Sequence, residues 1–86
     1  MALEFAGKTA LVTGSSRGIG LAIASLLHTQ GCKVALNSRH ADQLASVAAS
    51  MPGSVCVAGD MSQPVDASRV VEESRIALGQ LDILVC

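Results

Sequence analysis

Runs of aliphatic and β-branched residues alternate along the chain with segments whose apolar residues recur at helical spacing. The runs occupy residues 8–13, 33–37, 54–58 and 81–86, and a glycine or a polar residue follows each of the first three. Short apolar runs without polar alternation are typical of parallel strands that are buried on both faces. The pattern therefore predicts four strands of one parallel sheet.

The segments between these runs predict three helices, at residues 18–30, 41–50 and 64–78. The apolar residues that recur at helical spacing in the first helix are Ile19, Ala22, Ile23, Leu26 and Leu27. Those of the second helix are Leu44, Val47 and Ala48, and the small or apolar residues of the third are Ala67, Val70, Val71, Ser74, Ala77 and Leu78. Each stripe is expected to cover a face of the sheet.

Strand and helix alternate at short spacing, which favours right-handed crossovers between parallel strands. The expected fold class is therefore α/β, with the strand order 3-2-1-4 of the first half of a doubly wound (Rossmann) sheet. A chain of 86 residues has room for one such unit and not for a second domain. The sheet is expected to be partial, because the chain ends inside the fourth strand.

Composition and charge narrow the possible partners. Hydrophobic residues make up 50% of the chain and charged residues 15%, which excludes a disordered segment. The net charge of −1 provides no broad positive field, so neither nucleic acid nor a membrane is expected as a partner. We expect a cytoplasmic protein, because no secretory leader is recognisable and no run reaches the roughly 18 apolar residues of a membrane span.

The cysteines and histidines predict no metal site. Cys32, Cys56 and Cys86 are an odd number, widely spaced and placed in aliphatic runs, so we expect three buried, reduced thiols. His28 and His40 have no Cys, Asp or His nearby at ligand spacing and are expected at the surface.

A glycine-rich segment, TGSSRGIG at residues 13–20, joins the first predicted strand to the first predicted helix. Backbone N–H groups and the positive end of a helix can bind a pyrophosphate at this position. Gly14 is expected to permit the tight turn, Gly18 the approach of the phosphate, and Gly20 the packing of helix on sheet, so that any side chain would obstruct. The alternative is a structural glycine-rich turn. The candidate binding residues of this loop are Gly14, Ser15, Ser16, Arg17, Gly18, Ile19 and Gly20.

The spacing G-x-x-x-G-x-G differs from the general dinucleotide pattern, and in this the chain resembles the short-chain dehydrogenase/reductase family. The resemblance covers nearly the whole chain through the TGSSRGIG loop, the NSR turn after the second strand, Gly59-Asp60, and the run from Leu81 to Val85. It implies that residues 1–86 are the N-terminal part of an NAD(P)-binding Rossmann domain. In the family this last run leads into an Asn-Ala-Gly motif, and Cys86 stands just before the expected position of that Asn.

Charge at the end of the second strand predicts the cofactor subtype. In the family that the chain resembles, NAD-preferring members carry an acidic residue there, which binds the ribose hydroxyls and repels a 2′-phosphate. In this chain the position is Ser38, followed by Arg39, and Arg17 is expected to project toward the same region. Two guanidinium groups beside a neutral donor predict NADP. The alternative is two solvated surface arginines.

The resemblance also implies roles for residues near the other predicted strand ends. It implies that Asp60 accepts a hydrogen bond from the adenine amino group, that Met61 offers a backbone contact, and that Ile19 packs beside the pyrophosphate. The alternative for Asp60 is to close a turn or cap a helix. Asn37 either supports the ribose or only ends the strand, and the sequence leaves both open.

The function implied by the resemblance is hydride transfer between NADPH and a small-molecule carbonyl or alcohol, in a homo-oligomeric enzyme. The family's Ser-Tyr-Lys residues lie beyond the equivalent of residue 86, and this chain contains no Tyr. We therefore assign no catalytic residue and expect the 86 residues alone to be inactive. The alternatives are a stand-alone nucleotide-binding or interaction module and an extended-type nucleotide-sugar enzyme, whose TGxxGxxG spacing fits less well.

Overall fold

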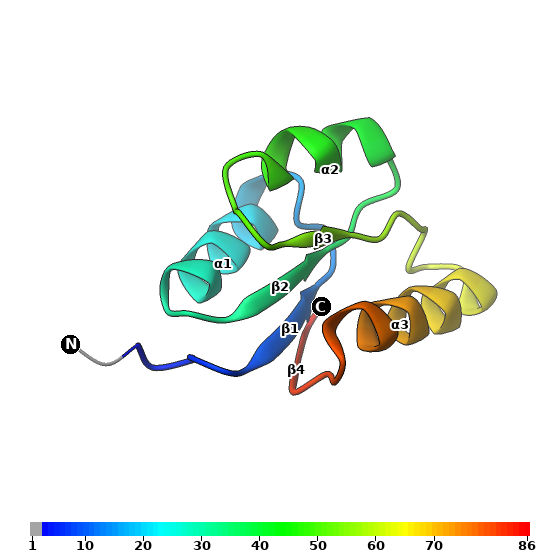
Figure 1. The fold of residues 1–86 in the computed structure, drawn as a ribbon. Coiled ribbons are helices and arrows are strands. Elements are labelled where there is room, and N and C mark those ends of the chain that lie inside the picture. The colour runs from blue at the N-terminus through cyan, green and yellow to red at the C-terminus, as the bar shows by residue number, and fades with distance from the viewer. Residues whose placement is uncertain (1–2) are drawn as a thin grey trace.

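All four predicted strands join one parallel sheet in the computed structural model, which describes residues 3–86 (Figure 1). They are β1 (Thr9–Val12), β2 (Lys33–Leu36), β3 (Val55–Cys56) and β4 (Ile83–Val85). Their order, β3-β2-β1-β4, confirms the predicted half of a doubly wound sheet. Each strand is shorter than its apolar run, because ladder pairing stops where the chain turns into a loop.

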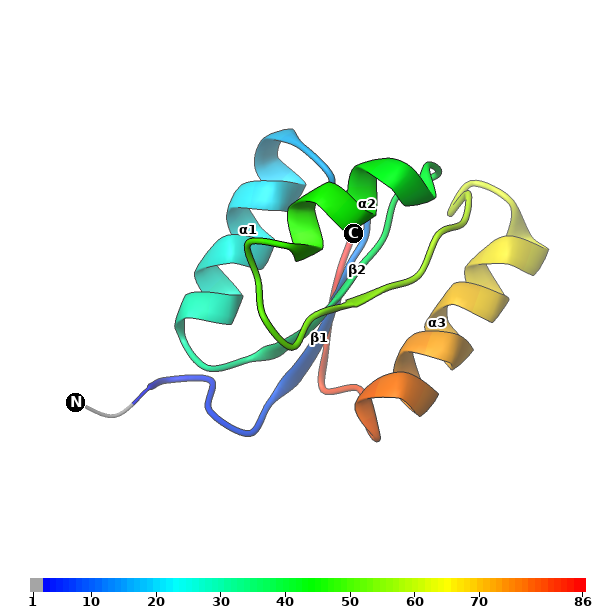
Figure 2. The same cartoon turned by 45° about the horizontal axis from the view of Figure 1, so that its top comes forward.

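The three predicted helices are α1 (Gly18–Thr29), α2 (Ala41–Ala48) and α3 (Pro64–Leu78). Figure 2 shows α1 and α2 on one face of the sheet and α3 on the other. Pro64 is tolerated at the start of α3, and Gly79 ends this helix with a left-handed φ of 86°.

Alternation along the strands divides the core into two halves. One half is formed by buried residues of the sheet together with α1 and α2, among them Ala10, Val12, Val34, Leu36, Ala24, Leu27 and Leu44. The other half joins the intervening strand residues to α3 through Leu11, Ala35, Val57, Val70 and Leu78. The central strands β1 and β2 are therefore buried on both faces, as their continuous apolar character predicts, whereas β3 and β4 each carry an exposed residue.

The stripe predicted for the first helix is partly wrong. Ile19 and Leu26 are 81% and 61% exposed, whereas the buried residues of α1 are Ala24 and Leu27. The helix is apolar nearly all round, so its spacing does not select the face that packs on the sheet. The predicted stripe of α2 meets the core, and that of α3 does so through Val70, Val71, Ser74 and Leu78, whereas Ala67 is half-buried and Ala77 is exposed.

The cysteines also depart from expectation. Cys32 is buried, but Cys56 and Cys86 are exposed, and all three are free thiols. The expectation of three buried thiols fails because Cys56 lies in β3 and Cys86 directly follows β4, the two strands that form the edges of the sheet. Within residues 3–86, no helix has both the length and the apolar character needed to cross a bilayer, and no group of three or more potential ligands is placed to hold a metal ion.

The register brings three loops together. Val12 pairs with Leu36, and Leu36 pairs with Cys56, so β1, β2 and β3 end at one level. The loops that follow them therefore meet at the carboxyl edge of the sheet, the edge at which doubly wound folds bind their ligands.

Candidate functional site

An open cleft of about 370 Å³ lies where the loops after β1, β2 and β3 meet, a volume within the range of small-molecule sites. Eight of the twelve predicted site residues line it: Gly14, Ser16, Arg17, Asn37, Ser38, Arg39, Asp60 and Met61. Five further residues line it that the sequence analysis did not select: Thr13, His40, Gln43, Gly59 and Ser62. The structure therefore brings most of the predicted residues into one site.

Four predicted residues lie outside the lining of this cleft. Ser15 is fully buried beneath it. Gly18, Ile19 and Gly20 form the start of α1, where the Ile19 side chain is left 81% exposed. The amino end of α1 has Arg17 as its N-cap, and this residue makes no side-chain capping bond. The first backbone N–H groups of α1 therefore remain available to an anion.

The glycines of the loop are required for two different reasons. Gly14 and Gly18 have left-handed φ angles of 61° and 63°, yet a Cβ at either would meet nothing within 4 Å. Backbone conformation therefore demands glycine at both positions, as expected for the tight turn at Gly14, and the approach of a phosphate to Gly18 stays a prediction. A Cβ on Gly20 would lie 2.9 Å from the carbonyl carbon of Gly14 and 3.2 Å from the Cα of Ser15. Gly20 thus allows α1 to pack against the loop itself, and not against the sheet as expected.

Asn37 connects the three loops from inside. It is 1% exposed, and its amide nitrogen donates to the carbonyl oxygens of Val57 at 2.9 Å and Gly59 at 3.3 Å. Its Oδ1 accepts the Gly14 N–H at 3.4 Å. Its backbone N–H donates to Ser15 Oγ at 2.9 Å, and its carbonyl oxygen accepts the Ser15 N–H at 2.8 Å. Asn37 therefore does more than end the strand.

Two arginines contribute positive charge to the lining of the cleft. Arg17 comes from the glycine loop and Arg39 from the turn after β2, and both are exposed. Ser38, which also lines the cleft, is 8% exposed, and its hydroxyl donates to the His40 carbonyl oxygen and accepts the His40 N–H, both at 3.1 Å. A phosphate that accepts a hydrogen bond from the Ser38 hydroxyl must displace the bond from this hydroxyl to the His40 carbonyl oxygen.

Asp60 closes the turn after β3. Its Oδ1 accepts the Ser62 hydroxyl at 2.7 Å and the Ser62 N–H at 3.0 Å. These bonds lower the pKa of the Asp60 carboxyl, and the charge of Arg39 lowers it further. The turn-closing role left open by the sequence is therefore present. Within residues 3–86, Oδ2 accepts no hydrogen bond, so the predicted contact with adenine is compatible with the turn.

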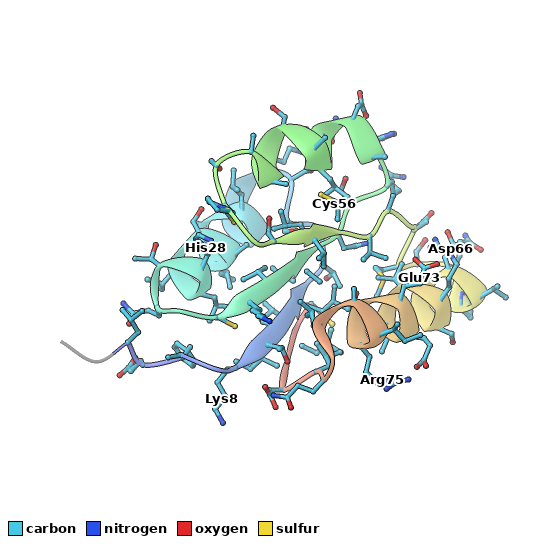
Figure 3. All side chains as sticks on the ribbon, in the orientation of Figure 1. Lys8, His28, Cys56, Asp66, Glu73 and Arg75 are labelled. Atoms are coloured by element: carbon cyan, nitrogen blue, oxygen red, sulfur yellow. The ribbon has the colours of Figure 1, made fainter. Side chains whose placement is uncertain are left out.

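The amino-terminal half of α3 holds the same turn from outside. Asp66 accepts the Asp60 N–H at 3.1 Å, and Arg69 donates to the Ala58 carbonyl oxygen at 2.8 Å. Arg69 is itself paired with Glu73 at 3.0 Å and lies 3.9 Å from Asp66. Both carboxylates come from α3 (Figure 3). The turn that carries Asp60 is thus fixed to the helix that follows it.

His40 and Gln43 are the most informative of the missed residues. His40 is the N-cap of α2, and Gln43 lies in its first turn, where its Oε1 accepts the Ser16 hydroxyl at 3.3 Å. Both follow β2 closely in sequence. The rule that ligands bind at the carboxyl ends of parallel strands points to helix amino ends as well, and would have selected them.

Comparison with known proteins agrees with this architecture. The family model described as short chain dehydrogenase matches residues 8–86. A glucose 1-dehydrogenase of Gluconobacter oxydans is 47% identical over 88 residues, which cover 96% of this chain and 33% of that protein. The chain thus spans about a third of the length of this relative.

Two solved structures are similar in fold and sequence. An L-sorbose reductase of Gluconobacter frateurii, complexed with NADPH and L-sorbose, matches with a TM-score of 0.88 and 39% identity. That match covers 98% of this chain and 34% of the reductase. A 3-ketoacyl-(acyl-carrier-protein) reductase of Brucella melitensis, complexed with NADH, matches with a TM-score of 0.88 and 32% identity, over 94% of this chain and 34% of that one. The two relatives therefore hold different cofactors.

Proposed function

The chain belongs to the short-chain dehydrogenase family, and we propose that it forms the NADP(H)-binding portion of an enzyme that interconverts a carbonyl and an alcohol. This family consists of oxidoreductases with an NAD(P)-binding Rossmann fold. The proposal adds NADP as the cofactor and a small-molecule carbonyl or alcohol as the substrate of the whole enzyme.

The observation that carries the choice of NADP is the charge of the cleft. Arg17 and Arg39 both line it, and the position after β2 that precedes Arg39 carries Ser38 in place of a carboxylate. A 2′-phosphate is attracted by both guanidinium groups, whereas a free 2′-hydroxyl gains little from them. One charge-assisted hydrogen bond contributes about 1.5–3 kcal/mol, roughly ten- to a hundredfold in affinity.

The remaining walls fit the other parts of a dinucleotide. The open space over Gly18 and the uncapped amino end of α1 suit a diphosphate. Asp60 and Met61, on the opposite wall, suit an adenine ring, and the exposed Ile19 offers an apolar contact beside the diphosphate. The cofactor supplies or accepts the hydride when bound, while these residues hold and orient it.

Catalysis is assigned to the whole enzyme and not to these 86 residues. The chain has no Tyr, which is the family's usual proton donor, so we propose that it is inactive by itself. A cytoplasmic location and assembly into a homo-oligomer belong to the same proposal and rest on the family alone.

A second candidate is a nucleotide-binding or interaction module without catalysis, and the lack of Tyr in these 86 residues fits both candidates. The two candidates differ in what the encoding transcript contains. A reading frame that continues into Asn-Ala-Gly supports the enzyme, whereas a stop codon after Cys86 supports the module.

The direct test is a fluorescence titration of the purified 86-residue chain with NADPH and NADH. We expect saturable binding that favours NADPH, and we expect Arg39→Ala to remove most of that preference. Arg75→Ala is the matched control, because Arg75 lies in the last turn of α3, paired with Glu72 and outside the cleft (Figure 3). Equal binding of both cofactors by the unmodified chain would refute the choice of NADP.

A further inference from the structure

Asn37 is the only Asn in the chain. It directly follows β2 and lines the cleft. Its side chain bonds to two different walls. Oδ1 accepts from Gly14 on the phosphate wall, residues 13–17, while the amide nitrogen donates to Val57 and Gly59, the latter on the adenine wall, residues 58–62. Within residues 3–86, no other side chain hydrogen-bonds to both sides in this way.

The other supports each reach only one wall. Ser15 binds the Asn37 backbone and so secures the phosphate wall to β2. Asp66 and Arg69 secure the adenine wall to α3. The Gly59 N–H also donates to the Ser38 carbonyl oxygen at 3.0 Å, so backbone bonds hold each wall to the end of β2. Among the side chains of residues 3–86, only that of Asn37 joins the two walls directly.

Burial of the Asn37 side chain makes the loss of this connection costly. Asn37 is 1% exposed, so an amide group deprived of its partners would gain no compensating bond from water. Its donors and acceptor are used by protein groups, which leaves the amide poorly placed to bind a ribose as well.

We propose that Asn37 is a positioning residue that sets the separation of the phosphate and adenine walls, and that it does not itself bind the cofactor. The inference rests on the proposed function, because the separation matters only for a ligand that spans both walls. A dinucleotide or 2′,5′-ADP spans them. Inorganic pyrophosphate occupies the phosphate wall alone, so its affinity is independent of the separation.

The test compares Asn37→Ser with the unmodified chain, using 2′,5′-ADP and inorganic pyrophosphate as probes and backbone amide chemical shifts as the readout. We expect 2′,5′-ADP to bind about tenfold more weakly to the variant, with pyrophosphate affinity changed less than twofold. Ser74→Ala is the matched control, because it removes another fully buried hydrogen bond, from Ser74 Oγ to the Val70 carbonyl oxygen, away from the cleft. Equal losses for both probes would overturn a positioning role.

If Asn37→Ser does not fold, hydrogen exchange of the unmodified chain tests the inference instead. The Gly14 amide and the Asn37 side-chain amide should exchange hydrogen slowly, because both are engaged in the connection. Rapid exchange at both groups would overturn the inference. Failure of the unmodified chain to bind any nucleotide would overturn the proposed function, whereas strong binding that Asn37→Ser leaves intact would overturn this inference alone.

Discussion

Gly20 packs directly against the peptide of Gly14, so that the first turn of α1 and the turn after β1 form one unit. A Cβ on Gly20 would lie 2.9 Å from the Gly14 carbonyl carbon and closer still to its oxygen. These neighbours are backbone atoms, and they cannot move aside by rotating a side chain. The relationship ties the amino end of α1 to the cleft.

Gly20→Ala should therefore lower the free energy of unfolding by about 3 kcal/mol, the upper part of the range for overpacking, and weaken nucleotide binding. Gly53→Ala is the control, because Gly53 has a φ of 86° but a Cβ there meets nothing within 4 Å. We expect that variant to lose only about 1–2 kcal/mol, from its left-handed backbone, and to bind normally. Urea denaturation measures both, and equal losses would contradict the close contact.

Ser38→Asp should reverse the cofactor preference. Its carboxylate can accept the His40 N–H that the Ser38 hydroxyl accepts now, so the turn should be retained. A negative charge at the end of β2 would repel a 2′-phosphate and accept bonds from ribose hydroxyls. We expect the ratio of NADPH to NADH affinity to fall by about ten- to a hundredfold in fluorescence titration.

Ser38→Asn separates the effect of charge from that of shape, since it has the same outline as Asp without the charge. It should weaken NADPH binding only slightly. An unchanged ratio in Ser38→Asp would place the 2′-phosphate elsewhere.

Asp82 should make stability depend on pH in acid. Its Oδ2 accepts the Thr9 N–H at 2.9 Å and the Thr9 hydroxyl at 3.1 Å, which lowers the carboxyl pKa below its ordinary 3.8, with a smaller contribution from the charge of Lys8. The ionised form is therefore favoured in the folded chain. Its contribution is fully present above about pH 4 and is lost as the pH falls through the lowered pKa.

Asp82→Asn should accordingly lower the thermal midpoint at pH 7 and reduce the loss of stability as the pH falls below about 4. Glu4→Gln provides the comparison, because the Glu4 side chain makes no hydrogen bond or ion pair in the described part of the chain. Thermal unfolding followed by circular dichroism across this pH range measures both. Parallel curves for Asp82→Asn and the unmodified chain would refute the prediction.

The three thiols should react at two distinct rates. Cys56 and Cys86 are exposed, whereas Cys32 is 3% exposed and burial raises the pKa of its thiol, assisted by the charge of Asp82. A thiolate is the reactive form, so Cys32 is protected both by access and by protonation. Mass spectrometry after brief iodoacetamide treatment at pH 8 should show two modified thiols, and a third only in urea. Three rapid modifications would contradict the burial of Cys32.

The sequence by itself determined the order of strands and helices and the glycine-rich loop that borders the cleft. These follow from local features. Continuous apolar runs indicate buried parallel strands, short crossovers are right-handed, and the glycines of residues 13–20 stand between a strand and a helix. The order 3-2-1-4 and most of the cleft lining could therefore be predicted without coordinates.

Only the tertiary structure decided which side chains serve the interior and which face the cleft. Ser15 was predicted beside the phosphate but is buried against Asn37, and Gln43 joined the cleft because α2 begins at the same edge. The apolar Leu26 stays exposed, since α1 turns Ala24 toward the sheet. These outcomes depend on contacts between segments far apart in the chain, and local hydrophobicity carries no information about such contacts.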